Sequence, residues 1–279
     1  MTRTWTVGVD AGGTWLRVMA TDGSGRRWTT KERAAGELSP ALHAIWRRRR
    51  VRPATVAHLV LAARGVWTTA ERRAAVRRLR GLARRISVLS DVEAAYHGAI
   101  GDRAGLLVLA GTGSIVLARS SNGIFFRAGG LGPLFGDGGS AFALGRDWLA
   151  AVRPLDARRV ARAPDAVARI AALAPRVLRL SRRGDGPARL AVARGSLMLA
   201  LDMRAAAGSA RLSGPITVSW AGSLLEDRGY RDLLWRTARR LGLRLTPIAP
   251  KASALEAAAH LAARSAATVS LASATPRVR

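Results

Sequence analysis

The chain has 279 residues and no cysteine, and its 46 lysines and arginines against 18 aspartates and glutamates give a formal net charge of +28. The length is sufficient for two domains, each with its own core. The absence of cysteine excludes disulfides, thiolate metal sites, iron–sulfur clusters held by this chain and thiol nucleophiles, and it fits a cytoplasmic protein.

The positive charge is carried almost entirely by arginine, because Lys31 and Lys251 are the only lysines. A charge of this size often indicates a nucleic-acid or membrane partner. Here the arginines are spread along the chain, with one tight run at Arg47–Arg50. This distribution favours a solvated surface, and an anionic partner stays open as the alternative. The N-terminus has no secretory apolar stretch, and the most apolar segment, 106–118, is too short to span a bilayer.

In the first hundred residues, apolar runs separated by glycine turns predict a β-hairpin followed by strands and helices in alternation. In chain order, we expect strands at 4–9, 16–20 and 28–33, a helix at 40–50, a strand at 56–62, a helix at 69–85, a strand at 86–89 and a helix at 92–100.

A second pass of the same kind begins at Gly105. In chain order, we expect strands at 105–110, 115–119 and 124–127, a glycine-dense loop at 129–140, helices over 141–207, a strand at 216–220, a helix at 231–241, a strand at 243–248 and a helix at 252–264. Residues 265–279 are expected to be disordered. The two passes together predict a duplicated α/β architecture.

Three glycine turns follow predicted strands, and each could hold a phosphate. They are Asp10-Ala11-Gly12-Gly13-Thr14, Gly111-Thr112-Gly113-Ser114 and Ala221-Gly222-Ser223. Glycine leaves backbone N–H groups uncovered, so a phosphate can approach them closely. A hairpin turn that needs positive φ is the alternative for each. Neither G-x-x-x-x-G-K-[ST] nor G-x-G-x-x-G is present, which disfavours P-loop and Rossmann folds. Asp10, at a strand end, could also hold Mg²⁺, directly or through water.

The order and spacing of these turns resemble those of the sugar kinase, actin and heat-shock-chaperone ATPase superfamily. Within it, the chain is more similar to N-acetylglucosamine kinases and the related BadF/BadG/BcrA/BcrD-type ATPases, over residues 5 to about 262. The segments that carry the similarity are 8–14, 90–95, 109–114, 129–132 and 136–140. The resemblance implies an α/β fold of two actin-like, ribonuclease H-like domains, with ATP and substrate in a cleft between them. We place the domains at 1–103 and 104–279, with the last helix, 252–264, able to pack back on the first domain.

The resemblance also assigns a role to each motif. It implies a sugar kinase that uses ATP and Mg²⁺ to phosphorylate a hydroxyl of N-acetylglucosamine or a related amino sugar, with Asp91 as the catalytic base. The candidate ATP-binding residues are Asp10, Gly12, Gly13, Thr14, Gly111, Thr112, Gly113, Ser114, Gly222 and Ser223. The candidate substrate-binding residues are Asp91, Thr112, Gly130 and Asp137. The implied partners are ATP and an amino sugar, without specific nucleic acid or a membrane, and a homodimer is allowed.

Asp91 follows a short apolar strand and precedes a helix, so its side chain is expected to face a cleft. There, a carboxylate can accept the proton of a sugar hydroxyl during phosphoryl transfer. An N-cap role is the alternative for Asp91, and an ordinary loop role is the alternative for Asp137. Glu93 is expected to be structural, because residues i and i+2 of a helix face apart. The histidines lack metal-ligand spacing and are also expected to be structural; they are His43, His58, His97 and His260.

Three departures from the pattern of these kinases leave the sugar open. Leu131 stands for the tryptophan of Gly-Gly-Trp-Gly, and Gly138 stands for the glutamate of Gly-Asp-Glu-Gly-Ser. Segment 36–40 lacks the asparagine expected to contact the sugar. Two alternatives therefore remain: a BadF-type ATPase without sugar kinase activity, and a non-enzymatic nucleotide-binding regulator. An activator that holds an iron–sulfur cluster through its own cysteines is disfavoured, because this chain has none.

Overall fold

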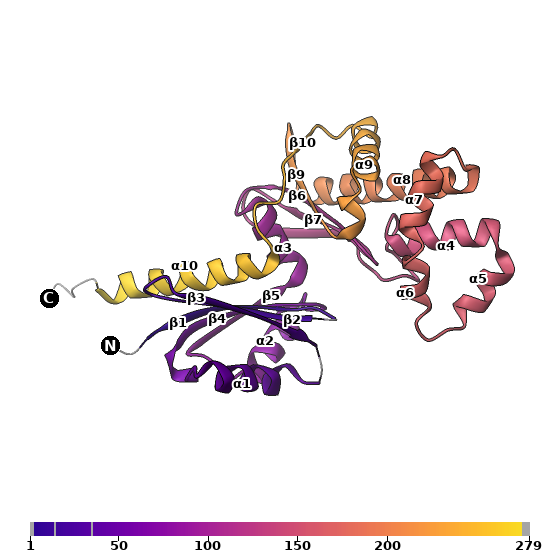
Figure 1. The fold of residues 1–279 in the computed structure, drawn as a ribbon. Helices are drawn as coiled ribbons and strands as arrows, with labels where there is room; N and C mark the ends of the chain where they lie inside the picture. Colours follow the sequence, from indigo (N-terminus) through magenta and orange to yellow (C-terminus); the bar gives the residue numbers. More distant parts are fainter. Residues whose placement is uncertain (1–2, 14, 35, 275–279) are drawn as a thin grey trace. The chain divides into compact units, whose positions relative to one another are not determined.

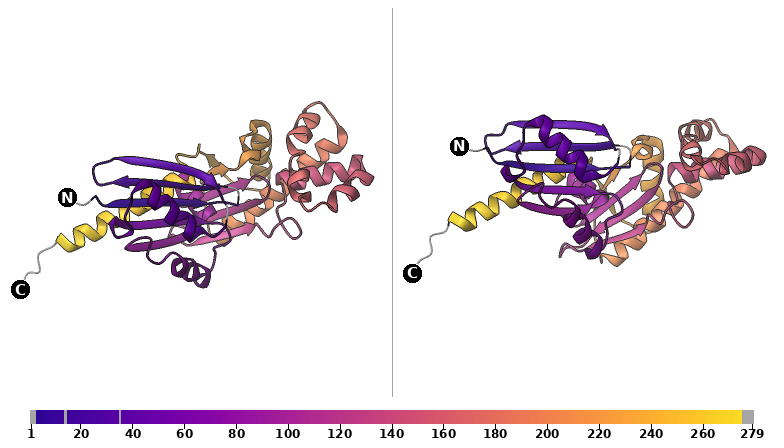
Figure 2. Two further views of the ribbon diagram at one scale, coloured as in Figure 1. Left: turned by 60° about the horizontal axis from the view of Figure 1, so that its bottom comes forward. Right: turned by 90° about the horizontal axis from the view of Figure 1, so that it is seen from below.

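The computed structural model describes residues 3–13, 15–34 and 36–274. The chain divides into two compact units. One takes in the chain up to Gly98 and from Lys251 onward, and the other extends from Ala99 to Pro250. Each unit contains one five-stranded sheet with helices packed on it (Figures 1 and 2).

The sheet of the first unit begins with the predicted hairpin. Strands β1, β2 and β3 pair antiparallel in succession, and β4 and β5 then extend the sheet from β1 in parallel, which gives the order β3-β2-β1-β4-β5. The strands are β1 (Trp5–Ala11), β2 (Trp15–Asp22), β3 (Arg27–Arg33), β4 (Val56–Ala63) and β5 (Arg85–Ser90). Because β1, β4 and β5 are parallel, their carboxyl ends lie at the same edge of the sheet, where open α/β sheets commonly bind ligands.

The sheet of the second unit repeats this topology. Strands β6, β7 and β8 form an antiparallel meander, and β9 and β10 extend it from β6 in parallel, in the order β10-β9-β6-β7-β8. The strands are β6 (Gly105–Ala110), β7 (Ser114–Arg119), β8 (Phe125–Gly129), β9 (Ile216–Ala221) and β10 (Leu245–Pro247). The repeat confirms the prediction of a duplicated α/β architecture.

In the first unit, alternation along the strands sends successive side chains to opposite faces of the sheet. Val7 and Leu61 pack with Leu42 of α1 on one face, whereas Val60 packs with Ala258 of α10 on the other. In Figure 1, α1 and α2 accordingly lie on one side of this sheet and α10 on the opposite side. The helices are α1 (Leu38–Arg49), α2 (Thr69–Arg78), α3 (Asp91–Ile100), which crosses the boundary between the units, and α10 (Ala254–Ala274), with a 3-10 turn η1 (Pro53–Thr55).

The last helix runs along β1 and β4 and is longer than predicted. Residues 265–279 were expected to be disordered, but α10 continues to Ala274, so this prediction was wrong for 265–274. That stretch is rich in alanine and has neither proline nor glycine. Such residues extend a helix at little cost once it has been nucleated.

Six helices of the second unit pack with its sheet around a second hydrophobic core. Helix α8 places Leu199 and Met203 against Val108 and Val116 of the sheet. The helices are α4 (Ala141–Val152), α5 (Pro154–Ala161), α6 (Ala166–Ala171), α7 (Ala174–Arg182), α8 (Gly186–Ser209) and α9 (Arg228–Arg240), with a 3-10 turn η2 (Ser223–Glu226). Over the ranges that the structure describes, none of the helices has both the length and the apolar character needed to cross a bilayer.

Candidate functional site

The carboxyl end of β1 carries Asp10, the first predicted phosphate-site residue. Asp10 is buried, and its Oδ2 accepts a hydrogen bond from Arg17 Nη1 at 2.8 Å across the β1–β2 pair. Among the described residues, no group of three or more histidine, cysteine, aspartate or glutamate side chains could hold a metal ion. A Mg²⁺ ion at Asp10 would therefore take most of its ligands from phosphate oxygens and water, as Mg²⁺ usually does at nucleotide sites.

The first glycine turn joins β1 to β2 directly after Asp10. The N–H of Gly12 donates to Trp15 O at 3.0 Å. Neither Gly12 nor Gly13 has a left-handed φ, and a β-carbon at either would meet its nearest neighbour at 3.4 Å or beyond. The turn conformation thus does not require glycine at either position, which favours a backbone left bare for a ligand over the hairpin alternative. Thr14, also predicted to bind ATP, lies outside the described residues.

Arg64 is a cation beside this turn that the sequence interpretation missed. It follows β4 directly, it is exposed, and its Nη1 lies 3.6 Å from the position that a β-carbon of Gly13 would take. Its positive charge also acts on the carboxylate of Asp91. The available signal was the Arg64-Gly65 pair directly after a buried strand. An arginine in this position can neutralise phosphate charge.

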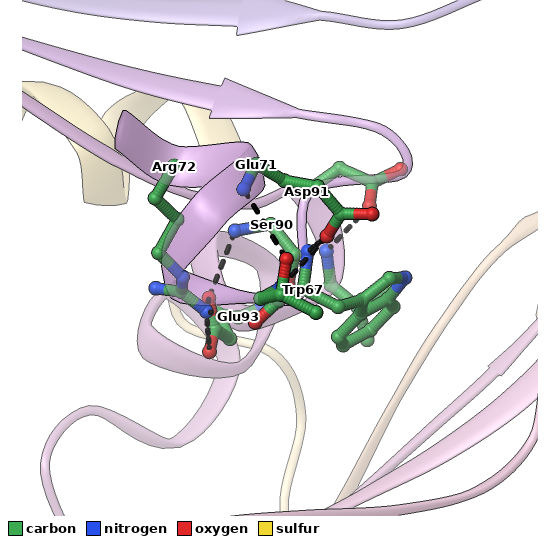
Figure 3. Close-up of polar contacts among 8 residues, drawn as sticks. Trp67, Glu71, Arg72, Ser90, Asp91 and Glu93 are labelled. Carbon is green, nitrogen blue, oxygen red and sulfur yellow. Dashed lines mark hydrogen bonds and ion pairs between the residues drawn. The ribbon is translucent and has the colours of Figure 1, made fainter. Parts of the chain in front are cut away.

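Asp91 begins α3 immediately after β5 (Figure 3). The helix is capped by its neighbour Ser90, whose Oγ accepts from Glu93 N at 3.1 Å while Glu93 Oε2 accepts from Ser90 N at 2.8 Å. This is a reciprocal capping box, so the N-cap alternative for Asp91 was wrong. Glu93 also forms an ion pair with Arg72 at 2.7 Å. These contacts give Glu93 a structural role.

The surroundings of Asp91 favour its protonated form. Burial raises the pKa of its carboxyl group, and the negative charge of Asp10 raises it further. The hydrogen bond from Val92 N and the charge of Arg64 act in the opposite direction, and the net pKa shift is upward from 3.8. A carboxylate with a raised pKa is a stronger base than an exposed aspartate. The effect of Asp10 on Asp91 also shows that the two predicted site residues of this unit lie close enough to interact.

In the second unit, sheet pairing brings the other two glycine turns together. β6 and β9 are parallel neighbours, with Leu109 opposite Ala221. The turn at Gly111 and the turn at Gly222 therefore leave adjacent strand ends, and a β-carbon at Gly111 would lie 3.8 Å from Ser223 Oγ. Gly222 itself has φ +90 and packs against the backbone of Ala110, so its conformation and packing require glycine.

A pocket of about 650 Å³ opens beside these two turns. Thr112 and Ser223 lie on its polar side, and a row of small apolar residues from α6 and α7 forms much of its wall. Those wall residues are Ala168, Ala171, Ala172, Ala174, Pro175 and Leu178. Arg179 adds positive charge at the same pocket, where Arg182 is paired with the carboxylate of Asp227. An apolar wall beside hydroxyls and a guanidinium group suits a purine nucleotide.

Asp137 lies beside the second turn, in the glycine-dense loop. It is buried with φ +58, and its Oδ2 lies 2.7 Å from the position that a β-carbon of Gly113 would take. Glycine at 113 therefore lets this carboxylate approach the turn. Gly130, also predicted to contact substrate, has φ +69 and packs against Ile115. The hydroxyl of Ser114 donates to Gly138 O at 3.0 Å and so ties the loop to the turn.

The sequence matches the model of the BadF/BadG/BcrA/BcrD ATPase family over residues 2–258. The chain belongs to this family. A 75-residue segment is 40% identical to an N-acetylmuramic acid/N-acetylglucosamine kinase of Clostridium acetobutylicum, and it spans 26% of this chain and 24% of that relative.

Solved structures of other proteins resemble the chain over nearly its whole length. A candidate N-acetylglucosamine kinase from Chromobacterium violaceum has a TM-score of 0.70 and 24% identity, covering 94% of this chain and 100% of that one. A glucokinase of the ROK family from Streptomyces griseus, in complex with glucose and AMPPNP, has a TM-score of 0.56 and 19% identity, covering 93% and 99%. These similarities confirm the predicted α/β fold of the actin-like sugar kinases.

Two of the departures from the kinase pattern, Leu131 and Gly138, lie in the glycine-dense loop, and the structure shows what surrounds each of them. Leu131 is 61% exposed. A β-carbon at Gly138 would lie 2.8 Å from Met198 Cβ on α8, so a glutamate at that position would require α8 or the loop to shift. Met198 thus occupies space that a side chain at position 138 would need.

Proposed function

We propose that the protein is an ATP-dependent kinase that transfers the terminal phosphate of ATP to a hydroxyl of N-acetylglucosamine or a closely related amino sugar. The observation that carries this proposal is the pocket at Thr112 and Ser223, where two glycine turns far apart in the sequence meet beside an apolar wall. The Clostridium acetobutylicum relative acts on N-acetylmuramic acid and N-acetylglucosamine by its name, and the Streptomyces griseus structure holds glucose with an ATP analogue. Both support a sugar acceptor.

In this proposal, the pocket takes the adenosine of ATP, and the turn at Gly111 and Gly113 faces its phosphates. The turn at Gly12 and Gly13 and the guanidinium of Arg64 provide further phosphate contacts in the first unit. Asp10 would help to hold a Mg²⁺ ion, which would supply charge neutralisation for phosphoryl transfer.

Asp91 acts as the general base. As the sugar oxygen forms its bond to the terminal phosphorus, the proton of the hydroxyl passes to the Asp91 carboxylate, and the bond between that phosphorus and the bridging oxygen of ADP breaks. The raised pKa of Asp91 suits this role, because proton transfer is more favourable to a stronger base. Asp137, Gly130 and Thr112 contribute to sugar binding.

One observation favours a second function, an ATPase without sugar kinase activity. The contact between Gly138 and Met198 removes the space for the glutamate that related kinases carry in this loop. If that glutamate is indispensable for sugar binding, the protein would hydrolyse ATP without phosphorylating sugar.

Release of ADP, measured with Mg²⁺–ATP in the presence and absence of a panel of amino sugars, tests the proposal. A kinase releases ADP at a rate that depends on the sugar and forms one sugar phosphate for each ADP. Equal rates with and without every sugar would support the ATPase instead. An absence of ADP release under all conditions would contradict both functions and support a nucleotide-binding regulator.

A further inference from the structure

The turn that presents Asp137 is held by two hydroxyl groups from outside it. Ser114 Oγ donates to Gly138 O at 3.0 Å, and Tyr230 Oη donates to Gly139 O at 2.9 Å. Within the turn, Ser140 N donates to Asp137 O at 3.1 Å. The carbonyl groups that follow Asp137 thus have a fixed set of donors, one of which comes from α9.

Tyr230 makes this hydrogen bond from a buried position. Its side chain is 1% exposed, and burial raises the pKa of its hydroxyl well above the ordinary value, so the group keeps its proton and remains a donor. Gly139 has φ +78, and a β-carbon there would lie 2.3 Å from Gly195 O. Because the turn is packed this tightly, loss of the tyrosine hydroxyl would leave the Gly139 carbonyl without its donor.

The N-cap of the same helix, Asp227, lines the nucleotide pocket. Asp227 caps α9 by accepting from Tyr230 N at 3.0 Å, and its carboxylate binds Arg182 Nη1 at 2.8 Å. Asp227 and Arg182 both line the 650 Å³ pocket. A continuous set of contacts therefore runs from the pocket through Asp227 and Tyr230 to Gly139 and the Asp137 turn.

We propose that Tyr230 is a positioning residue that holds the Asp137 turn for sugar binding and couples it to the nucleotide pocket. This inference rests on the proposed kinase function. Nucleotide in contact with Asp227 and Arg182 stabilises the start of α9, and α9 in turn holds the Gly139 carbonyl and hence Asp137 in place. Nucleotide and sugar then favour each other's binding, since coupling between two sites is reciprocal.

Tyr230→Phe tests the proposal, because phenylalanine keeps the ring and removes only the donor. We expect the KM for sugar to rise about tenfold, the order expected for leaving one buried carbonyl unsatisfied, with kcat changed much less. The affinity gain for sugar on adding a non-hydrolysable ATP analogue should also shrink. The matched control is Ser196→Ala, since Ser196 Oγ on α8 donates to Thr237 Oγ1 on α9 at 3.0 Å, a hydrogen bond that does not involve the turn. It should lower Tm comparably and leave the KM for sugar unchanged.

A Tyr230→Phe protein with lowered Tm but wild-type KM and wild-type coupling would overturn the inference and leave the kinase proposal intact. Lack of sugar phosphorylation by the wild-type protein would overturn the kinase proposal and the inference with it. A second measurement uses the wild-type protein alone, in which the ATP analogue should slow amide hydrogen exchange over residues 137–140 without sugar. No change in exchange there, with nucleotide bound, would also contradict the coupling.

Discussion

Asp91 and its neighbour Ser90 allow catalysis to be tested separately from helix stability. Ser90 caps α3, and Asp91 does not. We therefore expect Asp91→Asn to lower turnover on the order of a hundredfold or more, because it removes the basic oxygen, while Tm stays the same or rises. Ser90→Ala, the control, should cost about 1 kcal/mol of stability through the lost cap and retain most turnover. Rates and melting temperatures of the two variants check this, and near wild-type turnover in Asp91→Asn would rule out the base role.

The pH dependence of kcat/KM follows from the raised pKa of Asp91. A general base acts when it is deprotonated, so activity should fall as pH falls through the pKa of Asp91 in the free enzyme. Because burial raises that pKa above 3.8, the acid limb should lie above the ordinary aspartate range. The effect of pH on stability has the opposite sign. The folded protein holds this proton more tightly than the unfolded chain does, so the free energy of unfolding should fall as rising pH ionises Asp91. A profile that stays flat down to the ordinary range would contradict the assignment.

At the residue scale, the sequence interpretation found the motifs and missed several of their partners. Asp10, Asp91 and the glycine turns could be found because the motifs are contiguous in sequence. The position of Arg64 beside Gly13 could not be predicted, because it depends on β4 lying beside β1. The clash that Met198 would make at position 138 was equally hidden, since α8 follows the loop by many residues.

The last helix is held to the first sheet by a close approach at one glycine. A β-carbon at Gly8 would lie 2.3 Å from Ala259 N on α10. Gly8→Ala should therefore displace the helix and cost about 1–3 kcal/mol, the usual range for overpacking. The control Gly23→Ala has no neighbour within 4 Å and no left-handed φ, so it should be nearly neutral. Chemical denaturation of both variants measures the difference, and equal stabilities would show that α10 does not pack on β1 as described.

His58 adds a pH-dependent contact to the same helix. Its Nε2 lies 2.9 Å from Ser87 Oγ and its Nδ1 lies 3.3 Å from Ala262 O, an arrangement that suits a neutral ring with its proton on Nδ1. Burial lowers the pKa of His58 from 6.5, and the charge of Arg85 lowers it further. The unfolded chain therefore binds this proton more readily, so the contribution of His58 is fully present above about pH 6.5 and declines as pH falls below it.

His58→Gln should remove that contribution to the pH dependence. The Tm of the wild type should fall more steeply than the Tm of the variant between about pH 7 and pH 5, the range over which the unfolded histidine gains its proton. Parallel Tm curves for the two proteins over this range would contradict a neutral buried His58.

At the element scale, most strands and helices could be predicted from hydrophobic periodicity and turn residues, but their exact ends could not. The helix predicted at 69–85 ends at Arg78, because the following residues form turns before β5. The tail after Arg264 lacked any stop signal, and its continuation as α10 could not be separated from disorder by composition. The packing of α10 on β1 depends on the β-carbon missing from Gly8, a glycine that reads as an ordinary strand residue in the sequence.

At the scale of the whole molecule, the two units repeat one sheet order, and each unit carries a glycine turn at the same place in that order. In both, the first strand of the antiparallel meander ends in a glycine turn: Gly12 follows β1, and Gly111 follows β6. The duplication could be predicted from the order of elements. The meeting of Gly111 with Ser223 could not, because it requires knowing that β6 and β9 are neighbours. The interpretation of the high positive charge as a solvated surface stays a prediction.

Transfer of phosphate from ATP to N-acetylglucosamine is the reaction whose direct measurement decides the proposed function. The protein is incubated with Mg²⁺, ATP labelled in its terminal phosphate and N-acetylglucosamine, and the products are separated and identified by mass spectrometry, with Asp91→Asn in parallel. We predict labelled sugar phosphate from the wild type in equal amount to ADP, and a yield lower on the order of a hundredfold from the variant. Labelled inorganic phosphate alone, with N-acetylglucosamine and every related amino sugar unmodified, would contradict a sugar kinase.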